Sequence, residues 1–294
     1  MSALVSYEPS VHECADLFTR VSTNGKAAPE EYVSTFTMPR VSDSREKNNE
    51  SLAELQSSNR AQCFLFKFFK KHEENPGKFH MGFIQLGCDT SVFAGSDATA
   101  ISLSSIFYHL LQNPKVVEKL REELAHAEEN GSLSERPTFK EAQDLEYLQA
   151  IIKEASRLHP ATGLPLERLV PEGGTTIAGQ FFPAGTTVGV NTWVEHRDPR
   201  TWGPDAEQFR PERWLISDES PLAMMNRHWI PLGAGSRLHI GKNILLLEVI
   251  KLAPRITRDF DWELHGHNKT HNFWFVKPER LDFTVSSRNI RVVL

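Results

Sequence analysis

The segment LGAGSRLHIGKN, residues 232–243, constrains the fold of this chain more than any other stretch. Gly233 and Gly235 allow backbone angles that side chains forbid, and they let the chain lie flat against a bound group. Arg237 offers a forked, permanent cation to a carboxylate or phosphate. Gly241 lets the start of the apolar helix that follows, ILLLEVIKLAPRI, pack close to whatever the loop holds. The segment therefore predicts a binding loop that leads directly into an apolar helix.

Composition restricts the class of protein without identifying it. With 294 residues and 39% apolar content, the chain can bury a substantial core. The formal net charge of −5, with acids and bases mixed, argues against a nucleic-acid surface. The cysteines are few and irregularly spaced, which indicates a reducing compartment without a disulfide framework; they are Cys14, Cys63 and Cys88.

Targeting signals are also absent from the pattern. The first ten residues have neither a basic nor an apolar region of a signal peptide. The longest uncharged apolar run, residues 98–111, is too short to span a bilayer. An intracellular protein is therefore expected, either cytoplasmic or held peripherally at the endoplasmic reticulum, without a signal peptide, a transmembrane segment or a membrane anchor of its own.

Apolar periodicity predicts a mainly α-helical chain with small β-sheets. Residues 1–61 are polar and rich in turn formers, and are interpreted as a partial N-terminal segment and linker, whereas the pattern is dense from residue 62 to 294. A capping box formed by Thr138 and Glu141 is expected before one of the helices. Helices are predicted over residues 63–75, 81–112, 114–130 and 138–158, and a short amphipathic helix over residues 13–21. Asn75-Pro76-Gly77 is expected to end the first of the longer helices, and Gly95, Ser96 and Asp97 to interrupt the second.

Two strand pairs are expected in the C-terminal half of the chain. TTIAGQFF and TTVGVN flank Pro183-Ala184-Gly185, which is typical of a hairpin between them. A second pair is predicted near the end, between NFWFV and RLDFTV. The sheets are therefore expected to be small and antiparallel.

Glu154 and Arg157 lie three residues apart on a predicted helix, so they share one face and can pair. An arbitrary pair of this spacing is most often a solvated surface ion pair. Here a third charged segment, FRPERW with Arg213, follows just ahead of the glycine-arginine loop. Three charges that satisfy one another inside a core need good geometry to offset the cost of desolvation.

Taken together, these motifs resemble those of the cytochrome P-450 family, most closely its fungal secondary-metabolism members. The loop is similar to F-G-x-G-x-R-x-C-x-G, with Leu232 in place of phenylalanine and His239 in place of the cysteine. AGSDATA, residues 94–100, resembles A-G-x-D-T-T on the oxygen-binding helix, with Ala98 in place of the first threonine. The resemblance runs from about Cys63 to Val285, the family's C-terminal half, and residues 62–294 are interpreted as a P-450-like haem-binding core. It implies a P-450-like fold without the N-terminal sheet, the anchor and the helices that roof the pocket.

The resemblance assigns expected roles to particular residues. Glu154, Arg157 and Arg213 are expected to form a buried structural network that supports the loop. Asp97 and Thr99 stand where the family relays protons to bound dioxygen, although Thr99 is one step, about 100°, around the helix from the family's threonine. The cofactor, haem b, is expected to bind at the loop; its expected partners are Arg168 and Arg237 for the propionates, with Gly233, Gly235, His239 and Gly241.

His239 decides between chemistries. A lone histidine is usually a satisfied polar residue, but this one occupies the axial position, and imidazole is a natural donor to haem iron. A neutral imidazole pushes less electron density to iron than a thiolate does. Three hypotheses therefore stand. The first is a haem-dependent monooxygenase that acts on a lipophilic small molecule with electrons from a flavoprotein reductase. The second is a His-ligated haem protein that does not oxygenate, and the third is a catalytically silent remnant that binds a ligand or partner.

Overall fold

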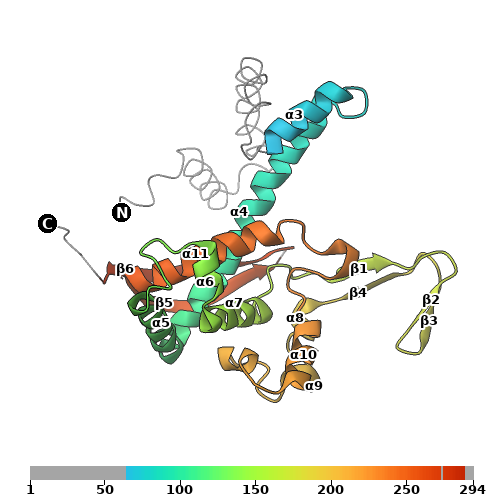
Figure 1. Cartoon of the computed structure of the whole chain (residues 1–294). Coiled ribbons are helices and arrows are strands. Elements are labelled where there is room, and N and C mark those ends of the chain that lie inside the picture. Colours follow the sequence, from blue (N-terminus) through green and yellow to red (C-terminus); the bar gives the residue numbers. More distant parts are fainter. Residues whose placement is uncertain (1–63, 273, 289–294) are drawn as a thin grey trace. The chain divides into compact units, whose positions relative to one another are not determined.

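The computed structural model describes residues 64–272 and 274–288. The chain divides into two compact units, residues 1–97 and residues 98–294. Helix α4 (Met81–Gln112) is one continuous helix that passes from the first unit into the second, without a break at Gly95. The helical class predicted from the sequence is confirmed: helices dominate the described residues, and the sheets are two-stranded and antiparallel (Figure 1).

The described part of the first unit is a helical pair. Helix α3 (Phe64–Glu74) ends where Asn75-Pro76-Gly77 was expected to end it, and the chain turns into α4. Phe69 and Ile84 form the buried centre of this pair. The apolar side chains packed around that centre are Leu65, Phe68, Phe79, Met81 and Cys88.

The second unit has its core among its longer helices. The helices that form this core are the second half of α4, α5 (Pro114–Glu129), α6 (Phe139–Gln143), α7 (Glu146–Leu158) and α11 (Lys242–Asp259). Helix α11, the apolar helix after the glycine-arginine loop, contacts α5, α6 and α7. Its Val249 and Ile250 are buried in the same cluster as Leu120 of α5 and Ile151 of α7.

Local signals define the ends of these helices. Pro114 starts α5, where the missing N–H of proline is not needed. The Thr138–Glu141 capping box is confirmed, because each side chain bonds the backbone N–H of the other residue, at 3.3 and 2.7 Å. Helix α7 begins against another helix, since the carboxylate of Glu123 on α5 accepts the N–H groups of Tyr147 and Leu148 at 2.7 and 3.0 Å.

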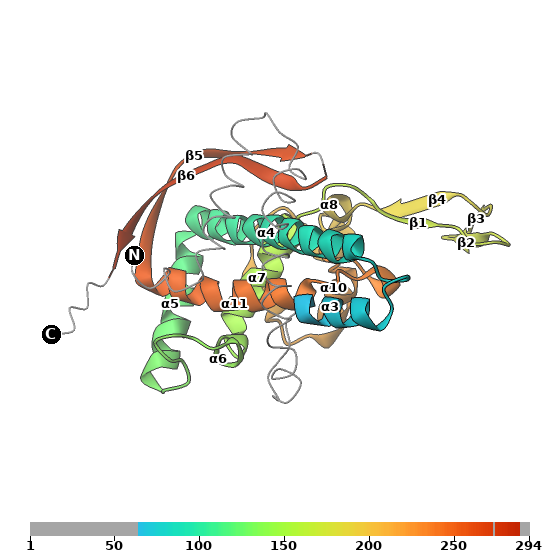
Figure 2. The same ribbon diagram turned by 90° about the horizontal axis from the view of Figure 1, so that it is seen from above.

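Between α7 and α11 the chain forms short elements that surround the site described below. The strands are β1 (Leu166–Leu169), β2 (Thr175–Ile177), β3 (Gln180–Phe182) and β4 (Thr187–Val190). The helices are α8 (Thr192–Glu195), α9 (Pro199–Trp202), the 3₁₀ helix η1 (Pro211–Trp214), α10 (Glu219–His228) and the 3₁₀ helix η2 (Gly235–Arg237). The chain of the second unit then ends in β5 (Phe260–Asn272) and β6 (Val276–Ser287), a long bent ribbon (Figure 2).

The strand pairing differs from the prediction in both places. TTIAGQFF folds on itself, with β2 paired to β3 around Ala178-Gly179, and β4 pairs with β1 instead. Both turn residues have positive φ, 50° and 83°, the conformation of a tight hairpin turn. Near the end, RLDFTV pairs mainly with residues 262–265, and the chain reverses within NFWFV. Figures 1 and 2 show β2–β3 carried at the outer end of β1–β4, away from the helices.

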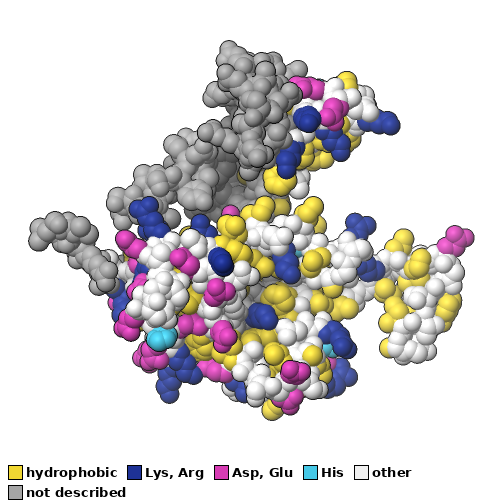
Figure 3. Space-filling view, viewed as in Figure 1, with side chains coloured by type: hydrophobic (Ala, Val, Ile, Leu, Met, Phe, Trp, Pro, Cys, Tyr) yellow, Lys and Arg dark blue, Asp and Glu magenta, His cyan; other side chains and the backbone are white. Residues whose placement is uncertain are grey.

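Apolar side chains are exposed on this outer hairpin, as the space-filling view shows (Figure 3). They include Ile177 on β2 and Phe181 on β3, and Leu169 and Val190 are exposed on the neighbouring β1–β4 pair. Among the described helices, none is long and apolar enough to cross a bilayer. The predicted amphipathic helix at residues 13–21 lies outside the described residues.

Candidate functional site

The glycine-arginine loop, residues 232–243, is closed by its own backbone. The N–H of His239 donates to the carbonyl of Leu232 at 2.9 Å, and the turn inside it contains the short helix η2. Gly233 has φ of 81° and Gly235 has φ of 63°, so both take the left-handed conformation expected of them. A Cβ at Gly233 would also lie 3.1 Å from the carbonyl oxygen of Arg237. The loop conformation therefore depends on glycine at these two positions.

His239 lies at the end of this loop with its ring against the start of α11. A Cβ at Gly241 would meet the ring, at 2.9 Å from Cε1 and 3.4 Å from Nε2. The Nδ1 atom of His239 is enclosed and has no hydrogen-bond partner among the described residues. A buried polar atom without a partner is uncommon and points to a functional or unfilled position. Gly241 thus provides the space that the imidazole occupies.

The two arginines predicted to bind propionates both lie at this loop, but only one of them is hydrogen-bonded to it. Arg168 on β1 donates to the carbonyl of Ala234 in the loop at 3.2 Å, and to that of Glu167 at 2.7 Å. Arg237 is exposed and forms no hydrogen bond or ion pair with any residue that the structure describes. One guanidinium therefore holds the loop to the β1–β4 pair, while the other is available to an anion.

Glu154, Arg157 and Arg213 form the buried network that was expected. Their side chains are 0%, 0% and 1% exposed. Arg157 binds both carboxylate oxygens of Glu154 at 2.9 Å, and Arg213 Nε binds Glu154 Oε1 at 2.8 Å. Helix α7 provides the first two residues and η1 the third, so the network fastens these two elements together.

Every N–H of the two guanidinium groups has a partner. The remaining donors of Arg157 reach the carbonyls of His196, Ala206 and Gln208. Those of Arg213 reach Trp202, Asp205 and Gln208. Glu154 accepts two further bonds, from the backbone N–H of Arg210 at 3.1 Å and the indole of Trp214 at 3.0 Å. This completeness is what allows three charges to remain in a core.

His196, which is fully buried, connects the network to the loop. Its Nδ1 lies 3.0 Å from the carbonyl of Arg157, and its Nε2 accepts the backbone N–H of Ile230 at 3.0 Å. The carbonyl of Ile230 then accepts the N–H of Gly233 at 3.1 Å. A continuous series of hydrogen bonds thus runs from α7 to the glycine-arginine loop. It requires a neutral ring with its proton on Nδ1.

The surroundings of His196 keep the ring neutral. Desolvation by burial lowers the pKa of His196 to about 4, and the nearby positive charges of Arg157 and Arg197 act in the same direction. Burial likewise lowers the pKa of His109, which stacks on Phe209 with a 4.7 Å centroid distance, to about 3. Both rings are therefore uncharged at neutral pH.

Of the α4 residues with an expected catalytic role, Thr99 belongs to the second unit and Asp97 to the first. The hydroxyl of Thr99 donates to Glu248 Oε2 on α11 at 2.7 Å. Asp97 is buried, with 2% of its surface exposed, as is the adjacent Ala98. Thr99 therefore bonds the helix that follows the glycine-arginine loop.

Several residues of the site have no sequence signal of their own. His196, Trp214 and Glu248 were not predicted, because their roles depend on partners that are distant in the sequence. Glu248 could have been suspected from its place on α11, nine residues after His239, but only the pairing with Thr99 gives it a role.

The residues present fit a haem. Imidazole is an established axial donor, and the ring of His239 forms no hydrogen bond with the residues that the structure describes. Because Nδ1 is covered by protein, Nε2 is the nitrogen through which this ring would reach a metal. Arg237 is available to a propionate, and the flat glycine backbone can lie close to a planar group.

Comparisons with known proteins agree on one family. The family model of cytochrome P450 matches residues 19–284. Cytochrome P450 monooxygenase cicH of Emericella nidulans is 42% identical over 229 residues, which are 77% of this chain and 46% of that protein. Pisatin demethylase of Fusarium vanettenii is 48% identical over 192 residues, 64% of this chain and 36% of that protein. This chain therefore spans less than half the length of these curated relatives.

Proposed function

Because the chain belongs to the cytochrome P450 family, a family that depends on haem b, we propose that it acts as a haem-dependent oxidoreductase of the monooxygenase type. The single observation that carries this proposal is the closed glycine-arginine loop with His239 at its end, at the position that corresponds to the family's ligand cysteine. The relatives are fungal monooxygenases, and the substrate proposed here is a lipophilic small molecule of fungal secondary metabolism. A flavoprotein reductase is the proposed electron donor.

In this proposal the chain's own residues hold the cofactor and keep the loop still. His239 would hold the iron through Nε2, and Arg237 would pair with a propionate. Arg168 positions the loop through Ala234 and can offer its remaining N–H groups to a second propionate. Bound haem supplies the iron centre that activates dioxygen in this family. Glu154, Arg157, Arg213 and His196 act at a distance by fixing the backbone that carries His239.

The histidine at position 239 and the hydroxyl groups of α4 favour a second candidate, a His-ligated haem protein that does not oxygenate its substrate. A neutral imidazole donates less electron density to iron than a thiolate, and O–O cleavage depends on that donation. Ala98 has no hydroxyl, and the hydroxyl of Thr99 is bonded to Glu248. Neither of these two positions therefore offers an uncommitted hydroxyl for proton delivery. The family's location at the endoplasmic reticulum, inside the cell, is proposed for either candidate.

The test is the absorption spectrum of the purified chain after expression with haem supplied. We expect a Soret band of the histidine type, and its loss or strong weakening in His239→Ala. His239→Cys should move the reduced carbon-monoxide band towards 450 nm, the position typical of thiolate ligation. The matched control is His126→Ala, which removes an exposed histidine on α5 and should leave the spectrum unchanged.

The outcomes separate the candidates. Product formation with a reductase, together with a histidine-type spectrum, supports the monooxygenase. The same spectrum without product, under conditions in which His239→Cys does form product, supports the non-oxygenating protein. An intact Soret band in His239→Ala would remove this residue from the axial position. Absence of any haem band would refute both candidates and leave the silent remnant.

A further inference from the structure

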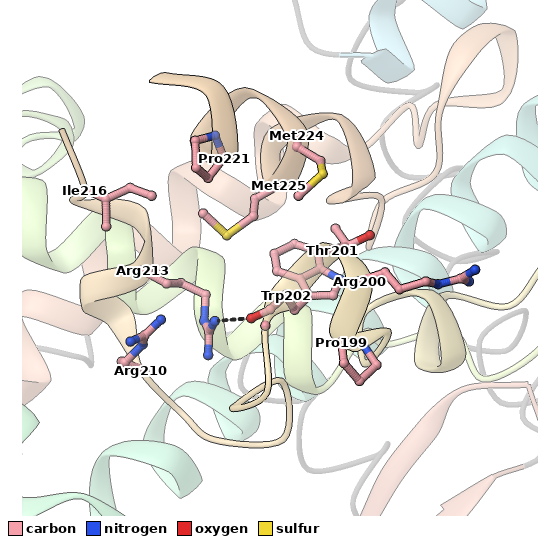
Figure 4. Close-up of a pocket in the computed structure, with 11 residues that line it drawn as sticks. Pro199, Arg200, Thr201, Trp202, Arg210, Arg213, Ile216, Pro221, Met224 and Met225 are labelled. Carbon is pink, nitrogen blue, oxygen red and sulfur yellow. Dashed lines mark hydrogen bonds between the residues drawn. The ribbon is translucent and has the colours of Figure 1, made fainter. Parts of the chain in front are cut away.

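A pocket separate from the glycine-arginine loop lies in the second unit, between α9, η1 and α10. It has a volume of about 290 Å³, close to the lower limit for small-molecule sites. Pro221, Met224 and Met225 extend from α10 on one side, and Trp202 and Arg213 face them (Figure 4). None of the residues predicted to bind haem lines this pocket, so the pocket is independent of the proposed function.

The walls of the pocket are largely apolar. Trp202 and Met225 are almost fully buried and form its base. Met224 and Ile216, which are 39% and 36% exposed, lie at its opening. The space-filling view shows apolar and basic side chains side by side over α9 and α10. Such walls favour the apolar body of a ligand, with methionine able to adapt to its shape.

The polar edge of the pocket is provided by Arg210. Its Nε is paired with Asp205 Oδ2 at 2.9 Å, and its backbone N–H is fixed on Glu154. The two terminal nitrogens of Arg210 form no hydrogen bond with any residue within the described ranges. The side chain is 51% exposed, so these nitrogens are held near the pocket and open to a ligand.

The other arginines at the pocket are already occupied. Arg213 has every donor satisfied, and Arg200 points away from the group in Figure 4, with its guanidinium paired to Asp198. Around the buried network, three arginines stand against two carboxylates, because Arg157, Arg213 and Arg210 share Glu154 and Asp205. The group therefore carries a net charge of +1, and Arg210 is its only member whose terminal nitrogens form no hydrogen bond with the described residues.

We propose that this pocket binds a small amphipathic carboxylic acid, with the carboxylate on the Nη1 and Nη2 atoms of Arg210 and the apolar body between Met224, Met225 and Trp202. A guanidinium fork matches a carboxylate in geometry, and such pairs are bidentate where both nitrogens are free. An aromatic or short aliphatic acid fits the volume and the single charge.

The test compares two probes of equal shape, 2-naphthoate and neutral 2-naphthalenemethanol, by isothermal titration with the purified chain. We expect the acid to bind about tenfold more tightly than the alcohol, the effect of one charge-assisted contact at a partly exposed site. Arg210→Met should abolish this preference. The matched control is Arg227→Met, because Arg227 is exposed on α10 and does not line the pocket.

A second pair of variants tests the apolar wall. Met224→Glu places a negative charge at the opening and should lower the affinity for 2-naphthoate by about tenfold or more. Ala223→Glu, at the exposed neighbouring position, should leave that affinity unchanged. Circular dichroism of each variant checks that the fold is retained. Equal affinity for acid and alcohol, or an unchanged preference in Arg210→Met, overturns the proposal. So does loss of acid binding in Arg237→Met alone, which would place the probe at the glycine-arginine loop.

Discussion

Substitution of Glu154 by glutamine tests whether the buried network holds the second unit together. The carboxylate accepts five hydrogen bonds, three at Oε1 and two at Oε2. A glutamine oxygen can replace Oε1, but its amide N–H₂ would then face the donors of Arg157 Nε and Trp214 Nε1. Two arginines would also lose their only fully buried counter-charge.

The expected loss follows from this geometry. Removal of one partner from a buried ion pair destabilises a protein by about 3–5 kcal/mol, because the other charge stays buried without compensation. Domains are stable by about 5–15 kcal/mol in total, so Glu154→Gln should lose a large part of the free energy of unfolding. Urea unfolding followed by tryptophan fluorescence measures this loss.

Two further variants make the measurement decisive. Glu207→Gln removes the ion-pair partner of Arg197. The Glu207 side chain is 74% exposed, so this change should alter the free energy of unfolding by about 1 kcal/mol or less. Trp214→Phe removes one of the donors that would oppose the glutamine amide. It should therefore cost less in the Glu154→Gln background than alone. A Glu154→Gln loss no larger than that of Glu207→Gln would refute the reasoning.

Two other predictions follow from the same site. The folded-state pKa of His196, about 4, lies below the unfolded value of 6.5, so its stabilising effect is complete above pH 6.5 and is lost as the pH falls towards 4. This should lower the free energy of unfolding by about 3 kcal/mol, with a further loss towards pH 3 from His109. Urea titrations at stepwise lower pH measure the free energy of unfolding at each pH. A free energy of unfolding that does not fall between pH 6.5 and pH 4 would mean that the His196 ring is charged in the folded state. Gly233→Ala combines a positive φ with a 3.1 Å approach to the Arg237 carbonyl oxygen, so it should lose more than the 1 kcal/mol or so expected for Gly131→Ala, which has φ of 75° and open space. Equal thermal midpoints for the two alanine variants would contradict that contact.

The sequence predicted the parts of the site that depend on motifs. Helix spacing predicted the pairing of Glu154 with Arg157, and the resemblance to the family implied that Arg213 joins them in one buried network. The family and the mainly helical fold were also predicted and are confirmed. The axial role of His239 stays a prediction, since its ring chemistry depends on the group it binds.

The sequence did not predict which strands would pair or which groups would bond His196. The turn residues Pro183-Ala184-Gly185 do form a turn, but β4 continues to β1 and not to the strand just before it, because Ala178-Gly179 closes β2 and β3 first. Alternation of side chains does not say which of several short strands will pair. His196 was missed for a related reason, since its importance lies in two backbone groups that come from distant segments.

The bond from Ile230 to His196 makes one amide a reporter for the whole loop. A backbone N–H accepted by a buried ring can exchange with deuterium only after the ring and the segment separate. Most other amides report the opening of a helix or strand, but this one reports detachment of the chain that leads to His239. Its exchange rate therefore measures how often the segment just before the loop separates from His196, with or without a bound cofactor.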